Sequence, residues 1–180
     1  MPSTLLTMFE YDAECANNFR DGNSYIYRGK DAALQHEYAY PLTDELKLRL
    51  QDVFVGDQSN PADLAQVEGN GPFDIIVDDG GHSMLQQITS LRELMRHVKP
   101  GGVYILEDLL TTYFWFDGPW HDEKLTGGIT TMQYIYALID ALNWPPSVKT
   151  LPAPYAGIAE LAQMVRSVNC FSELCVFTRK

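Results

Sequence analysis

The sequence has few basic residues, and this shortage bears on what the protein can bind. Its 180 residues include 13 Lys and Arg against 24 Asp and Glu, which gives a formal net charge of −11. Binding to a phosphate backbone depends on basic side chains that replace condensed counterions. The composition therefore argues against nucleic acid and against an anionic membrane as partners.

Long apolar runs are also missing. No stretch is long enough to cross a bilayer, and Met1-Pro2-Ser3 lacks the basic region and apolar core of a secretory signal. We therefore expect a cytoplasmic protein. An apolar content of 46% favours a globular protein over a disordered one, and the length fits one domain over residues 1–180.

Cysteine is scarce as well. Cys15, Cys170 and Cys175 are odd in number, and their positions lack the spacing of metal ligands. Neither a disulfide framework nor a zinc site is indicated. We expect the cysteines to be small core residues.

What the sequence does contain is two apolar runs that each end in a pair of carboxylates. Residues 73–77 are followed by Asp78-Asp79, and residues 103–106 by Glu107-Asp108. The segment between them has apolar residues at the spacing of a helix with one buried face: Met84, Ile88, Leu91, Leu94, Met95 and Val98. This pattern predicts a β-α-β unit with two buried parallel strands, so both acidic pairs should meet at one edge of the sheet. There they either hold a ligand or cap the following helices.

The rest of the chain extends this pattern to an α/β fold. Short strands are expected at residues 4–9, 25–28 and 53–55, a helix is expected at 130–143, and residues 168–177 read as an antiparallel hairpin. The sheet should be mostly parallel and flanked by helices. Residues 109–128 are rich in aromatic side chains. They form either a loop that covers the substrate or a packed aromatic cluster.

Three motifs together carry a family resemblance. Asp78-Asp79-Gly80-Gly81-His82, Lys99-Pro100-Gly101-Gly102 and Glu107-Asp108 resemble the macrocin and mycinamicin sugar O-methyltransferases, to which the cephalosporin hydroxylase-like proteins are related. The resemblance implies a Rossmann-like methyltransferase sheet, with S-adenosylmethionine and Mg²⁺ as cofactors. It also implies an enzyme of natural product biosynthesis that methylates a sugar or another hydroxylated small molecule, and it favours a homo-oligomer.

The resemblance assigns roles to particular residues. Asp79, Glu107 and Asp108 would hold the metal ion, and His82 would act as the catalytic base. On the cofactor side, Glu10 would bind the ribose, or else it favours the dipole of a following helix. Asp57 and Gln58 would contact the adenine side, or else they begin a turn, and Asp78 is assigned to the cofactor as well.

Two departures from the family pattern leave a second function open. The family's first strand and glycine-rich turn have no counterpart ahead of Thr4, and residues 21–50 look inserted. Residues 24–28 could supply a replacement strand; otherwise the sequence is a fragment, a divergent gene product, or one part of a sheet that another chain completes. The alternative to an enzyme is a catalytically inactive binding or assembly module with the methyltransferase fold, which does not bind the cofactor.

Overall fold

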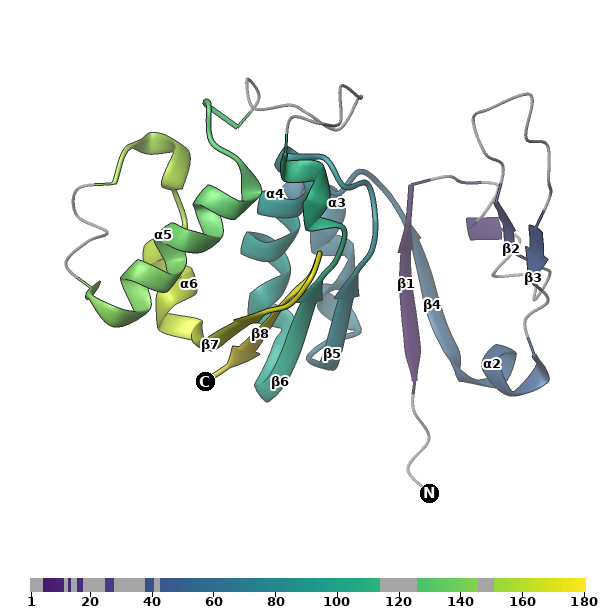
Figure 1. The fold of residues 1–180 in the computed structure, drawn as a ribbon. Helices are drawn as coiled ribbons and strands as arrows, with labels where there is room; N and C mark the ends of the chain where they lie inside the picture. The colour runs from purple at the N-terminus through teal and green to yellow at the C-terminus, as the bar shows by residue number, and fades with distance from the viewer. Residues whose placement is uncertain are drawn as a thin grey trace. The chain divides into compact units, whose positions relative to one another are not determined.

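The computed structural model describes residues 5–11, 13, 16–17, 25–27, 38–40, 43–113, 126–145 and 151–180 (Figure 1). The chain falls into two compact units, Met1–Asp57 and Gln58–Lys180, which are described separately here. The single domain stays a prediction. Among the described residues, no helix has the length and apolar character needed to span a membrane.

In the first unit, two parallel strands carry the predicted acidic ends. Strand β1 (Leu6–Glu10) pairs with β4 (Leu50–Val55), which follows helix α2 (Asp44–Arg49) directly. Glu10 lies opposite Val55, and its carbonyl oxygen accepts a hydrogen bond of 3.0 Å from the Gly56 amide. Both strands predicted for this part of the chain are present, with shifted ends.

Residues 25–27 form a strand, but the prediction that this strand replaces the family's missing first strand is wrong. Strand β2 (Tyr25–Tyr27) pairs antiparallel with β3 (Tyr38–Tyr40), and among the described residues these two form a sheet of their own. Pairing between segments close in sequence costs little loop-closure entropy, which favours this local pairing. The remainder of the predicted insertion up to residue 42, and most of the helix expected after Glu10, lie outside the described residues.

The second unit is built on one mixed sheet with the strand order β5-β6-β8-β7. Strand β5 (Phe73–Asp78) runs parallel to β6 (Val98–Leu106), while β8 (Cys175–Arg179) runs antiparallel to both β6 and β7 (Val165–Cys170). Helix α4 (Met84–Leu94) connects β5 to β6. The predicted β-α-β unit and the terminal hairpin are both confirmed.

The other elements of this unit are helical: α3 (Pro61–Leu64), η1 (Ala65–Gly69), η2 (Met95–His97), η3 (Leu109–Thr112), α5 (Thr131–Asn143), η5 (Ala153–Tyr155) and α6 (Ile158–Met164). Polar side chains fix where several of them begin. Asn60 accepts from the Ala62 amide at the start of α3, and Ser83 and Thr130 form capping boxes at the starts of α4 and α5.

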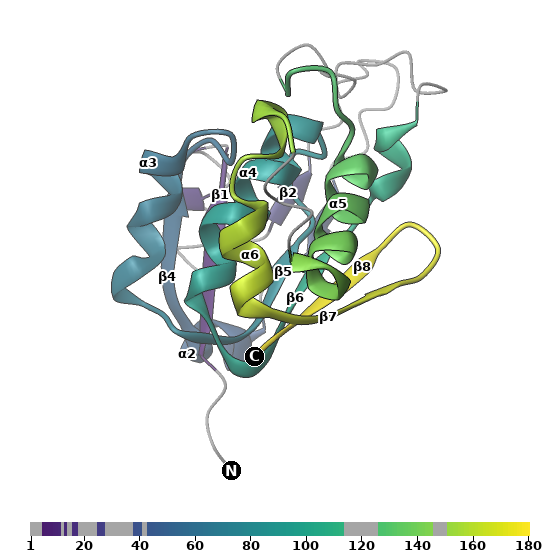
Figure 2. The ribbon, with the colours of Figure 1, turned by 90° about the vertical axis from the view of Figure 1, so that its left-hand side faces the viewer.

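Helices α4, α5 and α6 lie over one face of this sheet (Figure 2). The strand residues that point toward them are buried, including Tyr104, Leu106 and Phe177. On β5, however, Ile75 is 60% exposed and Val77 is 56% exposed. The prediction that β5 is buried on both faces is therefore wrong, because alternate side chains leave opposite faces of a strand and the described helices pack on one of them.

The expectation that the sequence has no disulfide is wrong, while the expected core position is confirmed for Cys175, which is fully buried. Cys170 and Cys175 form a disulfide, and Cys170 is exposed. The hairpin register sets the two residues directly opposite each other, which their sequence spacing alone did not indicate. Cys15, together with residues 114–125 of the aromatic-rich segment, lies outside the described residues.

A buried polar pair joins the ends of β5 and β6. The Tyr104 hydroxyl donates a short hydrogen bond to Asp78 Oδ2, and Gln58 Nε2 donates to Asp78 Oδ1 at 2.7 Å. Burial raises the pKa of the Asp78 carboxyl above its ordinary value of 3.8, although these hydrogen bonds partly oppose the shift. Burial, with the neighbouring Asp78, also raises the pKa of Tyr104 well above its ordinary value. Protonated Asp78 is therefore more favourable in the folded protein than in the unfolded chain.

This shift predicts a specific pH dependence of stability. The folded state binds the Asp78 proton more tightly than the unfolded chain does, so protonation of Asp78 stabilises the folded state. This stabilisation is complete below pH 3.8 and is lost as pH rises through the folded-state pKa. In Asp78→Asn this titration is absent. The free energy of unfolding of the wild type, minus that of the variant, should therefore fall as pH rises above 3.8, as measured by urea denaturation at several pH values.

Asp74→Asn is the matched control, because Asp74 lies on the same strand with its side chain 81% exposed. A difference between the wild type and Asp78→Asn that stays constant or grows with pH would contradict the prediction.

Candidate functional site

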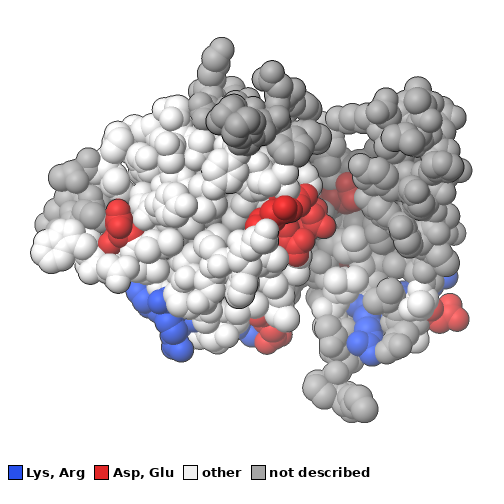
Figure 3. All heavy atoms as spheres, viewed as in Figure 1, with Lys and Arg blue, Asp and Glu red and all other residues white. Residues whose placement is uncertain are grey.

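The parallel register of β5 and β6 brings the two acidic pairs to one edge of the sheet. Asp78 lies opposite Leu106, and the Glu107 amide donates to the Asp78 carbonyl oxygen at 3.0 Å. The residues that follow both strands therefore leave the sheet side by side. In Figure 3, acidic side chains gather where these strands end, while the Lys and Arg side chains of this unit visible in that view lie elsewhere.

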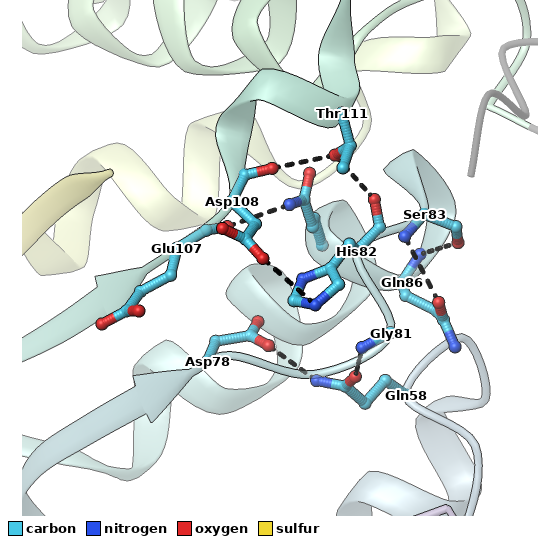
Figure 4. A network of polar contacts seen from close by, with 10 residues as sticks. Gln58, Asp78, Gly81, His82, Ser83, Gln86, Glu107, Asp108 and Thr111 are labelled. Atoms are coloured by element: carbon cyan, nitrogen blue, oxygen red, sulfur yellow. Dashed lines mark hydrogen bonds and ion pairs between the residues drawn. The ribbon is translucent and has the colours of Figure 1, made fainter. Parts of the chain in front are cut away.

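Two residues at this edge have left-handed backbone conformations. His82 has a φ of 56° and Asp108 has a φ of 53°. Non-glycine residues with positive φ are uncommon, and such conformations cluster at functional sites. Each lies in the loop that follows a strand, and the two side chains turn toward each other (Figure 4).

Three side chains converge at this edge. Each of Asp79, His82 and Asp108 offers one ligand atom, and these atoms all lie within 4.8 Å of one another. His82 Nε2 is 3.3 Å from Asp108 Oδ2, the separation of an ion pair when the imidazole carries a proton. The His82 side chain is 22% exposed and that of Asp108 is 43% exposed, so the group is open to a small ligand.

Glu107 lies outside this group. In Figure 4 its carboxylate points away from His82 and Asp108, and its backbone oxygen accepts a hydrogen bond of 3.2 Å from Gln87 Nε2. Both residues follow the end of β6, and the left-handed backbone at Asp108 turns its side chain to another side than that of Glu107. Its role as a third metal ligand stays a prediction.

Gln58 holds the loop that carries Asp79 and His82. Its Nε2 donates to Asp78 Oδ1 and, at 3.3 Å, to Ser90 Oγ, and its Oε1 accepts from the Gly81 amide at 2.7 Å. Both ends of the amide side chain are therefore engaged within the protein. The predicted contacts of Gln58 and Asp78 with a cofactor stay predictions, but the structure gives both residues a supporting role.

The glycines of this loop allow the glutamines to approach. A Cβ at Gly80 would lie 2.0 Å from Gln58 Oε1, and a Cβ at Gly81 would lie 2.1 Å from Gln86 Oε1. Each distance is far inside van der Waals contact. Any larger residue would have to displace a glutamine side chain that holds the loop or caps α4.

Sequence reasoning missed three supporting residues: Ser90, Tyr104 and Thr111. A signal existed for Tyr104, because a tyrosine in the middle of a buried apolar strand needs a hydrogen-bond partner. Nothing in the local sequence distinguished Ser90 or Thr111.

The remaining predicted cofactor residues belong to the first unit. Glu10 ends β1, and its Oε1 accepts a hydrogen bond of 2.9 Å from the Tyr11 amide. Asp57 follows β4, the parallel neighbour of β1. Both residues thus lie at or just beyond the C-terminal ends of paired parallel strands, where α/β sheets bind ligands. Their contact with a cofactor stays a prediction.

Comparisons with known proteins bear on this site. Demethylmacrocin O-methyltransferase of Streptomyces fradiae is 40% identical over 91 residues, which are 49% of this chain and 22% of the relative. Mycinamicin VI 2''-O-methyltransferase of Micromonospora griseorubida is 38% identical over 102 residues, 56% of this chain and 24% of the relative. A tetracenomycin-sugar 3'-O-methyltransferase of Streptomyces olivaceus is 35% identical over 161 residues, 87% of this chain and 38% of the relative. The chain thus spans well under half the length of these relatives.

A solved structure supports the fold. The methyltransferase MycE of the mycinamycin biosynthetic pathway, in complex with Mg and SAH, aligns with a TM-score of 0.60 at 20% identity, over 99% of this chain and 45% of MycE. MycE in complex with Mg, SAH and mycinamycin VI aligns with a TM-score of 0.58. No family model matches the sequence. The predicted methyltransferase fold is confirmed, and the chain is a relative of the macrocin and mycinamicin sugar O-methyltransferases.

Proposed function

We propose that the protein is a Mg²⁺-dependent, S-adenosylmethionine-dependent O-methyltransferase that acts on a hydroxyl group of a sugar or another natural-product diol. The observation that carries the proposal is the convergence of Asp79, His82 and Asp108 beyond two parallel strands. The named substrates of the relatives, which include mycinamicin VI and rhamnosyl tetracenomycin C, suggest the acceptor class.

The donor atoms suit a magnesium ion. Mg²⁺ prefers oxygen ligands and commonly binds one or two carboxylates while keeping several waters. Asp79 and Asp108 supply two carboxylates close enough to share one ion, and both are accessible to solvent. Glu107 is proposed as a further carboxylate on the same edge. When bound, the ion would orient a vicinal diol and lower the pKa of one hydroxyl.

His82 is proposed as the general base. It accepts the proton of the acceptor hydroxyl at Nε2, the nitrogen that faces Asp108. S-adenosylmethionine, when bound, would supply the methyl group and leave as S-adenosylhomocysteine, while His82 would hold the proton that the acceptor hydroxyl gives up. The Asp108 carboxylate attracts the positive charge that the imidazole acquires, and this favours the proton transfer.

Four residues at or near strand ends are proposed for the cofactor side. Glu10 is proposed to accept hydrogen bonds from the ribose hydroxyls, and Asp57 to contact the adenine side. Gln58 and Asp78 are proposed to act there mainly through the loop that they hold, since their polar side-chain atoms are bonded to Gly81, Ser90 and Tyr104.

Calorimetry with the full chain tests the proposal. We expect saturable binding of Mg²⁺ alone, and binding of S-adenosylmethionine that is tighter when Mg²⁺ is present. Absence of cofactor binding, even with the metal, would contradict the hypothesis of an enzyme. It would favour the alternative, a binding or assembly module with this fold.

The variant His82→Asn tests whether His82 acts as the general base or as a metal ligand. Asparagine tolerates the left-handed backbone at this position but cannot take up the proton. We expect turnover, measured as release of S-adenosylhomocysteine with mycinamicin VI as acceptor, to fall by about 10²–10⁴-fold. Metal affinity should stay close to that of the wild type. Equal loss of both would make His82 a metal ligand instead of the base.

Asp108→Asn tests the metal site itself. The variant keeps a residue suited to positive φ while removing one negative charge. We expect Mg²⁺ affinity to fall by more than the roughly 10–100-fold that is typical when groups behind the ligands are changed. Glu173→Gln is the matched control, because Glu173 also has a positive φ of 66° and is exposed outside the cluster. Equal metal affinity in the two variants would count against a site at Asp108.

A further inference from the structure

We propose that Thr111 is a positioning residue whose hydroxyl fixes the spacing between His82 and Asp108. This inference deepens the proposed function and depends on the roles assigned there to these two residues. Thr111 would touch neither metal nor substrate. It would act by joining the two turns that present the reactive side chains.

The geometry is direct. Thr111 Oγ1 lies 2.9 Å from the carbonyl oxygen of His82 and 2.9 Å from the carbonyl oxygen of Asp108. Figure 4 shows it between the two turns, with a contact to each. Only 5% of Thr111 is exposed, so water competes little for these bonds. The hydroxyl has one proton, which these two carbonyl oxygens share, so one bifurcated hydrogen bond links the two residues with left-handed backbones at this edge.

The position of Thr111 follows from the turn after Asp108. Helix η3 (Leu109–Thr112) begins directly beyond Asp108, and the Thr111 amide donates to the Asp108 carbonyl at 3.2 Å. This backbone bond ties Thr111 to the Asp108 side whatever its side chain is. The hydroxyl then supplies the link to the His82 side, which is 29 residues distant in sequence.

The two carbonyls do not depend equally on the hydroxyl. The Asp108 oxygen keeps its bond from the Thr111 amide when the hydroxyl is removed. Among the described residues, the Thr111 hydroxyl is the hydrogen-bond donor that the structure assigns to the His82 oxygen. When the hydroxyl is lost, Gln58 still holds Gly81 and the capping box of α4 still holds Ser83, while the Asp108 turn stays in place. The His82 carbonyl between these anchors should therefore shift relative to the Asp108 turn, and the distance between the two side chains should become more variable.

Three variants isolate the hydroxyl. Thr111→Val keeps the shape of the side chain and removes the donor, while Thr111→Ser keeps the donor. Thr112→Val is the matched control, because Thr112 lies in the same helix, is 3% exposed, and has a hydroxyl without a hydrogen-bond partner in the described part of the protein.

The first measurement is on the metal-free full chain. Nuclear Overhauser contacts between the His82 ring protons and the Asp108 β protons report the spacing without any ligand. We expect these contacts to weaken in Thr111→Val and to persist in Thr111→Ser and Thr112→Val. Amide exchange in the His82 turn should accelerate in Thr111→Val alone.

The second measurement is metal binding, with Mg²⁺ alone as the probe. Changing groups behind metal ligands typically costs about 10–100-fold in affinity or activity, so we expect a loss in that range for Thr111→Val. In turnover assays kcat should fall more than KM rises, because the spacing affects proton transfer more than acceptor binding. Thr111→Ser should restore both quantities.

The outcomes separate this inference from the proposed function. If the wild type binds no Mg²⁺, the proposed function fails, and the metal-free spectra still decide whether Thr111 sets the spacing. If the wild type binds Mg²⁺ but Thr111→Val keeps both its affinity and its nuclear Overhauser contacts, the positioning role is overturned. Equal losses in Thr111→Val and Thr112→Val would also overturn it, because both would then reflect packing alone.

Discussion

The parallel pairing of β5 with β6 is the constraint on which the site depends. It sets Asp78 opposite Leu106, so the chain segments beyond both strands emerge together and their acidic residues meet. The pairing is reinforced from inside by the buried contact between Tyr104 and Asp78. Without this register, residues far apart in sequence would have no reason to share one small volume. The strand pairing thus brings the site residues together at the sheet edge, and the loops set the final positions of their side chains.

Local patterns predicted most of this arrangement. The apolar runs before Asp78 and Glu107, with a helical period between them, predicted the β-α-β unit, because strand and helix periods are read from neighbouring residues. The hairpin at the end of the chain followed from two short apolar runs around a turn. The resemblance of the motif ending in His82 to a methyltransferase family then supplied roles that periodicity could not give.

What the sequence did not predict depends on contacts between distant segments. The exposure of Ile75 and Val77 depends on which faces of the sheet the helices cover, and the Cys170–Cys175 disulfide depends on hairpin register. The direction of Glu107 depends on how the backbone turns after β6. Gln58 looked like a cofactor contact by its place after a strand, but its bonds reach Gly81 across 23 residues of sequence. Pattern alone does not determine such contacts.

The close approach of Gln58 to Gly80 has an evolutionary consequence. A methyl group at position 80 would collide with the end of the Gln58 side chain, so a larger residue there requires this side chain to give up its present position. Substitutions at the two positions should therefore occur together in homologous sequences: where a side chain appears at the equivalent of 80, the glutamine should have become shorter or turned away. A glycine in the motif then marks a loop that a glutamine supports.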